Sequence, residues 1–333
     1  MSETALARQR ADVFAMSDLS TPWCVMVAAT LEVAERIAAG ATRIEDLAEN
    51  CRADANALGR VLRHLVREGV FEEPQPGTFA LNESARLLLS PQARWLRLDG
   101  FGGRMAHAWS GLLTATRTGK PAYSDLFGRP FWEDLQANPV IAADFDELMS
   151  PAGHGAPDPN VLLNNDWQSV RTVVDVGGGT GALLAEILRT RPTLQGTLVD
   201  QPATVARSGK IFESAGVTHR AKISGQSFFD PLPAGADLYL LKSVLSDWPD
   251  TEAELILRRC ALAARPNGGR VVILNGVAPD EMQTSPNLLM LVLVGGKDRS
   301  LNEFRALAQT AGLAVTAAGS QPSGRFLVEC RTL

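Results

Sequence analysis

The spacing of apolar residues divides the chain into two parts. Up to about residue 165, apolar residues recur at helical spacing, with few strand-like runs between them. From Arg171 onward, short apolar runs are followed by loops and then by amphipathic helical segments, and this order repeats. The sequence therefore predicts a mainly α-helical domain over residues 1–165 and an α/β domain over residues 166–333.

One segment of the helical part has a more specific pattern. Residues 44–50 are expected to form a short helix, and Asp54 can cap a second helix that runs to Gly69. The turn cluster PQPG separates two strand-like runs, at 70–72 and 78–81, which are typical of a β-hairpin. Two helices followed by a hairpin indicate a winged helix. The apolar face expected on its second helix consists of Leu58, Val61, Leu62, Leu65 and Val66.

The second helix of this segment also carries basic residues, which raises a DNA-binding hypothesis. Winged helices commonly bind DNA, and this helix holds Arg60, Arg63, His64 and Arg67. The chain as a whole is acidic, however, with a formal net charge of -5. The pattern therefore favours a dimerisation module with a solvated basic face over a DNA-binding regulator.

The C-terminal part reads as a doubly wound, largely parallel sheet with helices between its strands. The expected helices cover 181–190, 203–215 and 251–265, and the last two apolar runs suggest a hairpin at one sheet edge. The expected strands are TVVDV at 172–176, TLVD at 197–200, AKIS at 221–224, LYLL at 238–241 and RVVIL at 270–274.

Composition narrows the classes of function. The net charge of -5 gives no general attraction for nucleic acid or anionic membranes. The four cysteines lie far apart without a Cys-x-x-Cys pair, which argues against a metal site or disulfide framework and fits a reducing cytoplasm. The N-terminus lacks the apolar core of a signal peptide, and the apolar runs at 24–31 and 288–294 are too short to span a bilayer. A cytoplasmic enzyme with a small-molecule substrate is favoured, with no nucleic-acid or membrane partner.

Candidate chemistry begins at the first strand-to-helix turn of the α/β part, DVGGGTG at 175–181. Glycines such as Gly177 and Gly179 let a ligand approach the backbone closely, and the following helix offers free N–H groups. The spacing Gly-x-Gly-x-Gly differs from the Gly-x-Gly-x-x-Gly of dinucleotide binders. Asp200 ends the second strand, where a carboxylate can accept both ribose hydroxyls of an adenosyl group. Together these features predict S-adenosylmethionine (SAM), or its product S-adenosylhomocysteine, as the cofactor.

Five motifs resemble those of the plant caffeate-type and bacterial aromatic-polyketide O-methyltransferases, over nearly the whole chain. The chain looks most similar to methyltransferases of antibiotic biosynthesis, including the naphthoic acid type. The resemblance implies a Rossmann-like SAM-binding domain, a homodimer formed through a helical, winged-helix N-terminal half, and a small aromatic or polyketide-like substrate. The motifs are DVGGGTG (175–181), LVDQP (198–202), SFFDPLP (227–233), LLKSVLSDWPD (240–250) and GGKDRSLNEF (295–304).

The same resemblance implies roles for individual residues around the cofactor. Gly177 would lie near the methionine moiety, and Asp200 would hold the ribose. Ser227 takes a place often held by an aspartate that contacts adenine. Phe228 would pack on the adenine face, where an aromatic ring supplies apolar contact, and Lys242 would border the cofactor.

The catalytic pattern of the family is altered in this chain. The family's base is the histidine of a His-Asp-Trp triplet, whereas the sequence here reads Ser246, Asp247, Trp248. The positions of the two acidic partners of that histidine hold Asn275 and Asp298. A serine hydroxyl has no useful basicity at neutral pH, whereas histidine is poised near it. The resemblance therefore implies an acceptor that needs little deprotonation, such as an amine, a carboxylate or an acidified phenol.

Other residues are candidates for a replacement base or for simpler roles. His107 lies on a helix that contributes to the acceptor pocket in the family, and His154 lies in the loop before the cofactor domain, so both are second-rank candidates. Lys297 and Arg299 are expected to be solvated or ion-paired rather than to bind substrate. Trp248 is expected to serve in packing.

Three functions remain open from the sequence. The first is a SAM-dependent methyltransferase acting on a small aromatic or polyketide-like metabolite. The second is a SAM-binding tailoring enzyme that does not methylate but catalyses hydroxylation, decarboxylation, cyclisation or rearrangement. The third and least favoured is the winged-helix DNA-binding regulator.

Overall fold

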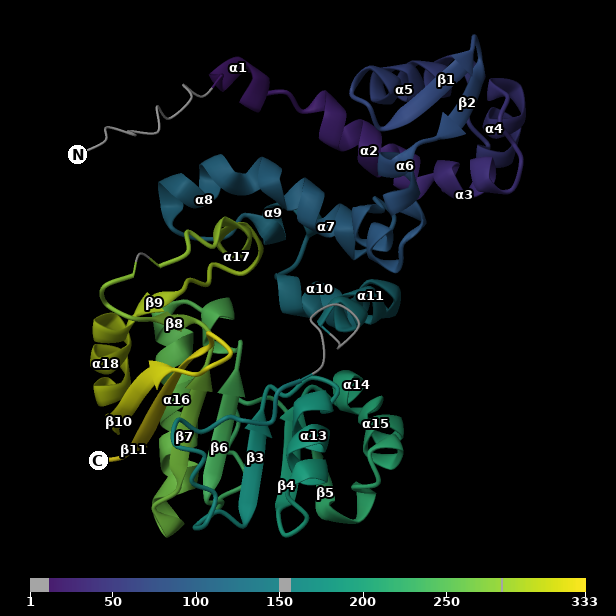
Figure 1. Ribbon diagram of the computed structural model, residues 1–333. Coiled ribbons are helices and arrows are strands. Elements are labelled where there is room, and N and C mark those ends of the chain that lie inside the picture. The colour runs from purple at the N-terminus through teal and green to yellow at the C-terminus, as the bar shows by residue number, and fades with distance from the viewer. Residues whose placement is uncertain (1–11, 150–156, 283) are drawn as a thin grey trace, which may run out of the picture. The chain divides into compact units, whose positions relative to one another are not determined.

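The computed structural model describes residues 12–149, 157–282 and 284–333 (Figure 1). The chain forms two compact units, one ending at Ala106 and the other beginning at His107. The domain boundary near residue 165 that the apolar pattern suggests lies inside the second unit and stays a prediction. Helix α7 (Phe101–Ala108) runs across the division between the units.

The first unit contains the winged helix. Asp54 caps α5 as expected, because its side chain accepts a hydrogen bond from the backbone N–H of Ala57 at 2.8 Å. Leu58, Leu62 and Leu65 of the expected apolar face are buried in one hydrophobic cluster with Phe71 and Phe79 of the hairpin, and Val61 and Val66 pack half-buried against it. The elements of this unit before α7 are α1 (Val13–Met16), α2 (Ser20–Thr30), α3 (Val33–Ala38), α4 (Ile44–Cys51), α5 (Ala55–Arg67), β1 (Phe71–Gln75), β2 (Thr78–Leu81), α6 (Glu83–Arg86), η1 (Leu87–Leu89) and η2 (Pro91–Leu96).

Two basic side chains of α5 have partners inside this unit. Arg63 forms an ion pair with Glu73 of β1, at 3.6 Å between Nε and Oε1. His64 Nε2 lies 2.8 Å from the hydroxyl oxygen of Thr21 on α2. The helix that would enter the major groove in a DNA-binding winged helix is therefore tied to α2 at His64.

Helix α2 belongs to the only stretch of the described chain that is long and apolar enough to cross a membrane, residues 13–30, by length and composition alone. This stretch is interrupted, because α1 ends at Met16 and α2 begins at Ser20. Ala28 and Ala29 of α2 are buried in the winged-helix cluster. These two alanines pack inside their own unit, whereas only 11% of the stretch as a whole is buried.

The second unit is built on a seven-stranded sheet with the order β10-β11-β7-β6-β3-β4-β5. The five strands from β5 to β7 pair in parallel, and the β10–β11 hairpin is antiparallel at one edge, as the sequence predicts. β3 lies between β4 and β6, so the strand order reverses at its carboxyl end, where doubly wound sheets bind ligands. The strands are β3 (Thr172–Val176), β4 (Gln195–Asp200), β5 (Ala221–Gly225), β6 (Leu238–Lys242), β7 (Arg270–Leu274), β10 (Leu313–Ser320) and β11 (Phe326–Thr332).

Helices cover both faces of this sheet (Figure 1). Val173 and Val174 are neighbours on β3 yet belong to different hydrophobic clusters, because successive strand residues point to opposite faces. The cluster with Val173 includes Leu184 of α13, and the cluster with Val174 includes Ile256 of α16. The helices flanking the sheet are α13 (Ala182–Thr190), α14 (Pro202–Val205), α15 (Ser208–Ser214), α16 (Asp250–Ala264) and α18 (Leu301–Thr310).

The helix expected over 203–215 is two helices in the structure. α14 ends at Val205, and α15 begins at Ser208. The buried hydroxyl of Ser208 donates a hydrogen bond to the carbonyl oxygen of Val205 at 2.7 Å. Side chains of this type compete with the helical hydrogen bonds of the backbone, and the break lies at that point.

The remaining elements of the second unit lie before the sheet, in connections between its strands, and between β7 and α18. They include a two-stranded parallel pair in which Val277 is opposite Arg299. These elements are η3 (Trp109–Gly111), α8 (Leu112–Thr118), α9 (Tyr123–Phe127), α10 (Phe131–Ala137), α11 (Pro139–Met149), η4 (Thr218–Arg220), η5 (Leu245–Asp247), η6 (Arg265–Asn267), β8 (Val277–Ala278), α17 (Leu288–Leu293) and β9 (Arg299–Ser300).

Candidate functional site

The glycine loop after β3 forms a cradle that only glycine fits. Gly177 and Gly179 have positive φ angles of 70° and 61°, which favour glycine. A Cβ at Gly178 would lie 2.4 Å from Asp175 Oδ2, and one at Gly177 would lie 2.7 Å from a methyl group of Val244. Packing within the protein therefore requires glycine at 177 and 178, whereas a Cβ at Gly179 would meet nothing within 4 Å, so the space beside Gly179 is open to a ligand.

Asp200 joins the end of β4 to the glycine loop. Its Oδ2 accepts a hydrogen bond from the backbone N–H of Gly179 at 2.8 Å, and its Oδ1 accepts one from that of Gln201 at 2.7 Å. Burial raises the pKa of Asp200, while these two backbone hydrogen bonds act in the opposite direction. Each carboxylate oxygen can accept a further hydrogen bond, so the group can still hold a ribose diol.

Asp175 is the most unusual group of the loop. Its side chain is 1% exposed, and neither carboxyl oxygen has a hydrogen-bond partner within the described part of the chain. Burial raises its pKa to about 7, the charge of Asp200 acts in the same direction, and the charge of Lys242 opposes both. A buried polar group without a partner costs free energy. A ligand that brings a positive charge or N–H donors would remove that cost, and SAM carries a sulfonium and an ammonium group.

An aromatic cluster lies beside the glycine loop. A Cβ at Gly177 would lie 3.5 Å from the ring of Phe228, which places that ring at the loop. Phe228 meets Trp248 edge-on, with ring centroids 5.9 Å apart, and Trp248 stacks on Trp132 of α10, also at 5.9 Å. Phe229 completes the cluster at 4.9 Å from Trp248. Trp248 therefore packs as expected, and the cluster offers a wall for a flat ligand.

Ser227 and Lys242 lie near this part of the site. The Ser227 hydroxyl oxygen accepts a hydrogen bond from the backbone N–H of Phe229 at 3.2 Å, so it helps to shape the turn that carries the aromatic rings. Lys242 ends β6, and its charge lowers the pKa of Asp175, which indicates that the two groups lie close together. The cofactor roles that the resemblance implies for both residues stay predictions.

Ser246 and Asp247 lie together in η5, immediately after β6. Ser246 is 8% exposed, and its hydroxyl donates a hydrogen bond to Asp247 Oδ1 at 3.5 Å. Burial raises the pKa of Asp247 to about 7, and the charge of Asp298 acts in the same direction, whereas the hydrogen bond from Ser246 lowers it. Two glycines pack on this turn: a Cβ at Gly276 would lie 3.2 Å from Ser246 Cβ, and one at Gly296 would lie 2.1 Å from the Ser246 carbonyl oxygen.

The other catalytic candidates are arranged differently. Asn275 is exposed and donates a hydrogen bond from Nδ2 to the hydroxyl of Ser243 at 2.8 Å, so its amide faces Ser243. Asp298 accepts a weaker hydrogen bond from Asn287 at 3.4 Å. His107 is exposed on α7, an element that none of these residues shares. His154 lies outside the described residues.

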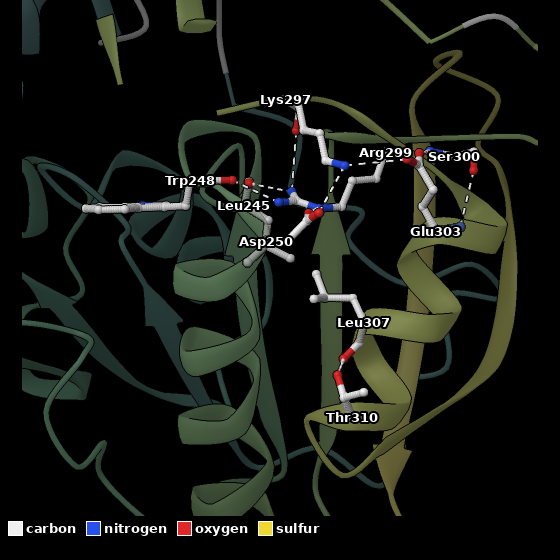
Figure 2. A network of polar contacts seen from close by, with 9 residues as sticks. All are labelled: Leu245, Trp248, Asp250, Lys297, Arg299, Ser300, Glu303, Leu307 and Thr310. Atoms are coloured by element: carbon white, nitrogen blue, oxygen red, sulfur yellow. Dashed lines mark hydrogen bonds and ion pairs between the residues drawn. The ribbon is translucent and has the colours of Figure 1, made fainter. Parts of the chain in front are cut away.

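Arg299 holds the backbone of η5 in place. It is 1% exposed, and its guanidinium donates hydrogen bonds to the carbonyl oxygens of Leu245 and Trp248, each at 2.8 Å (Figure 2). Its Nε pairs with Asp250 Oδ1 at 2.9 Å, and Lys297 pairs with the other oxygen of Asp250 at 3.1 Å. The expected ion pairing of Lys297 and Arg299 is present. The burial of Arg299 was not predicted, because the polar sequence around it gives no sign of a buried segment.

Comparisons with known proteins cover nearly the whole chain. The model of the O-methyltransferase domain matches residues 109–314, and that of the O-methyltransferase dimerisation domain matches residues 15–91. The chain is 44% identical over 310 residues to the 2,7-dihydroxy-5-methyl-1-naphthoate 7-O-methyltransferase of Streptomyces carzinostaticus. The aligned residues cover 91% of this chain and 92% of the relative. It is 39% identical to an aclacinomycin 10-hydroxylase of Streptomyces purpurascens, over 90% of this chain and 83% of the relative.

A solved structure of an O-methyltransferase is also similar to this chain over nearly its full length. An O-methyltransferase from neocarzinostatin biosynthesis, in complex with SAM and 2-hydroxy-5-methyl naphthoic acid, has a TM-score of 0.87 to this chain at 41% identity. The match covers 97% of this chain and 99% of that chain. The predicted fold class, an α/β cofactor domain with a mainly helical dimerisation part, is confirmed.

Proposed function

The chain belongs to the O-methyltransferase family, whose cofactor is SAM, and on that premise we propose that it methylates an oxygen of a small aromatic, polyketide-like acceptor. The observation that carries the proposal is the stacked pair of Trp248 and Trp132 near the glycine loop, with Phe228, the ring expected at the adenine, edge-on to Trp248. Stacked and edge-on rings favour a flat apolar acceptor. A hydroxynaphthoate, as in the similar enzyme of Streptomyces carzinostaticus, has this shape.

The residues of the cofactor end bind and orient. Asp200 would hold the ribose hydroxyls, the glycine loop would line the methionine moiety, and Asp175 would face positive charge. SAM supplies an electrophilic methyl group on a sulfonium when bound. The chain contributes by placing the acceptor oxygen in line with that methyl group, and such positioning supplies much of the rate of a two-substrate reaction.

The lost histidine restricts the acceptor. A simple phenol titrates near pH 10, to judge by tyrosine, and the Ser246 hydroxyl by itself is too weak a base to deprotonate it. We therefore expect acceptors whose hydroxyl is more acidic than that of a simple phenol. Ring substituents that stabilise the phenolate have this effect. Such acceptors need less help in losing the proton.

Incubation of the protein with SAM and a panel of hydroxynaphthoates tests the proposal. We expect stoichiometric S-adenosylhomocysteine and methyl ether, measured by chromatography and mass spectrometry, with faster turnover of the more acidic phenols. The Asp200→Ala variant is the control for cofactor dependence and should lose SAM affinity in calorimetry. If SAM binds but no acceptor of this class yields S-adenosylhomocysteine, the proposal is wrong.

A non-methylating reaction is the second candidate. It is favoured by the exchange of the family's histidine for Ser246 and by the 39% identity to a hydroxylase. In that case an acceptor would be converted while SAM is recovered intact. Mass balance of the cofactor in the same incubations separates the two candidates.

We also propose that the protein is a homodimer that works in the cytoplasm. Support for the dimer comes from the match of residues 15–91 to the dimerisation domain of the family. Light scattering of the purified full chain should give twice the mass of one chain. A monomer at micromolar concentration would contradict this part of the proposal.

A further inference from the structure

The exchange of histidine for Ser246 leaves an acidic group at the same place. Asp247 Oδ1 lies 3.5 Å from the Ser246 hydroxyl, which is its hydrogen-bond donor among the contacts of the described chain. The hydroxyl is thus already directed at a carboxylate. Hydrogen bonds between catalytic groups are often long without substrate and shorten in the reacting complex.

The turn that carries these two residues is fixed on several sides. Arg299 binds the carbonyl oxygens of Leu245 and Trp248, one on each side of the Ser246–Asp247 pair (Figure 2). Gly276 and Gly296 pack so closely against the turn that a side chain at either position would collide with it or crowd it. A pair held in this way keeps its geometry during a reaction, which general acid–base catalysis requires.

No cation is placed to keep the Asp247 carboxylate permanently charged, among the residues that the structure describes. The guanidinium of Arg299 is directed at carbonyl oxygens and at Asp250, and Lys297 pairs with Asp250 and Glu303. The charged group that acts on Asp247 is Asp298, whose like charge favours the protonated form. Burial acts in the same direction and raises the pKa of Asp247 to about 7, which is the range in which a general base works best.

We propose that Asp247 is the terminal proton acceptor of the methyl transfer and that the Ser246 hydroxyl relays the proton to it. This inference rests on the proposed function. The acceptor hydroxyl gives its proton to Ser246 Oγ, while the proton of Ser246 moves to Asp247 Oδ1. The acceptor oxygen uses its freed electron pair to form the new bond to the methyl carbon, and the electron pair of the broken carbon–sulfur bond stays on sulfur. Asp247 then releases its proton to water, so one proton is lost per turnover.

The dependence of kcat/KM on pH tests the relay in the full-length protein. For the wild type we expect kcat/KM to rise with pH to a plateau, with a midpoint near 7, since Asp247 must be ionised to accept the proton. Asp247→Asn should lower the plateau by about 100- to 10,000-fold and abolish the rise, because a general base contributes that range. Ser246→Ala should lower the plateau too, because the relay is cut. SAM affinity should stay unchanged in both variants.

Two further variants separate a proton relay from a structural role. Asp298→Asn removes the like charge next to Asp247, so the midpoint should move to lower pH, which a purely structural effect would not produce. Asp125→Asn neutralises an exposed carboxyl on α9 and is the matched control, with no change in midpoint or plateau expected.

The outcomes separate the two proposals. If the wild type turns over but Asp247→Asn keeps both its rate and its rise with pH, the relay is refuted and methyl transfer stands. If folded Asp247→Glu restores none of the rise while Ser246→Ala is fully active, the relay is also refuted. If the wild type forms no S-adenosylhomocysteine with any acceptor, methyl transfer itself is wrong and the relay falls with it.

Discussion

Two carboxyl groups at the carboxyl edge of the sheet, the buried Asp175 and the half-buried Asp247, share a pKa raised to about 7 but differ in their surroundings. Asp175 has no hydrogen-bond partner within the described residues, and its charged neighbours are Asp200 and Lys242. Asp247 receives a hydroxyl hydrogen bond from Ser246. The first arrangement suits a ligand that brings positive charge, and the second suits a proton that moves. A raised pKa marks a carboxyl group as a candidate for a functional site. The groups that surround the carboxyl group indicate which function it can have.

The largest effect on cofactor binding is expected from Gly178→Val, which disrupts the cofactor end and spares the acceptor end. Its Cβ would lie 2.4 Å from Asp175 Oδ2 and 2.6 Å from Leu198 Cδ1. Crowding of this kind destabilises the native loop by about 3 kcal/mol. Because SAM binds to the native loop, restoring that conformation on binding should lower SAM affinity by about 100-fold in calorimetry. Gly209→Ala is the matched control, because a Cβ there meets nothing within 4 Å. Normal SAM binding by folded Gly178→Val would show that the cradle does not hold the cofactor.

Asp175→Asn tests the role given to Asp175 in two ways, through the affinity for SAM and through the pH dependence of the Tm. Loss of a charged partner costs about 1.5 kcal/mol, so SAM affinity at pH 8 should fall by about tenfold. The pKa of Asp175 is raised in the folded protein, from 3.8 to about 7, so this group destabilises the fold progressively as pH rises between those values. Thermal unfolding in the absence of cofactor measures this effect. The Tm of the variant should exceed that of the wild type by an amount that grows from pH 4 to pH 7. An equal Tm difference at every pH would contradict the raised pKa.

Arg299→Lys tests the acceptor end alone. Lysine keeps the charge but lacks the planar fork that binds two carbonyl oxygens and Asp250 at once. We expect kcat to fall by about fivefold and Tm to fall, since several buried hydrogen bonds worth about 1 kcal/mol each are disturbed. The midpoint of the pH profile and the SAM affinity should not move. A shifted midpoint would mean that Arg299 acts on Asp247 by more than position.

The smallest effect is expected at the aromatic wall. Trp132→Ala removes the stacking partner of Trp248, and such a pair contributes about 1 kcal/mol beyond the area it buries. The KM for the aromatic acceptor should rise by about fivefold while SAM affinity is unchanged. Trp132→Phe should restore most of the affinity for the acceptor. An unchanged KM in both variants would remove Trp132 from the acceptor wall.

The sequence predicts those features that depend on local order. The strands, the glycine loop and the capping of α5 by Asp54 follow from periods and motifs within a few residues. The relation of Asp247 to Ser246 was not predicted, although the two are adjacent, because a turn and not a period sets the direction of their side chains. The burial of Arg299 depends on carbonyl groups 51 and 54 residues away along the chain. The stacking of Trp132 on Trp248 joins α10 to the turn after β6, and neither segment signals the other.

The way in which Arg299 holds η5 also bears on how this site can change. Arg299 binds carbonyl oxygens at 245 and 248, and every amino acid supplies a carbonyl oxygen. The close packing at Gly296 likewise involves backbone atoms of the turn, and the nearest side-chain atom at Gly276 is the Cβ of Ser246, which every amino acid except glycine has. The frame of the acceptor site is therefore largely indifferent to the side chains at 246, 275 and 298. A lineage, or a protein engineer, can exchange those three groups to obtain a different reaction without first having to rebuild the scaffold.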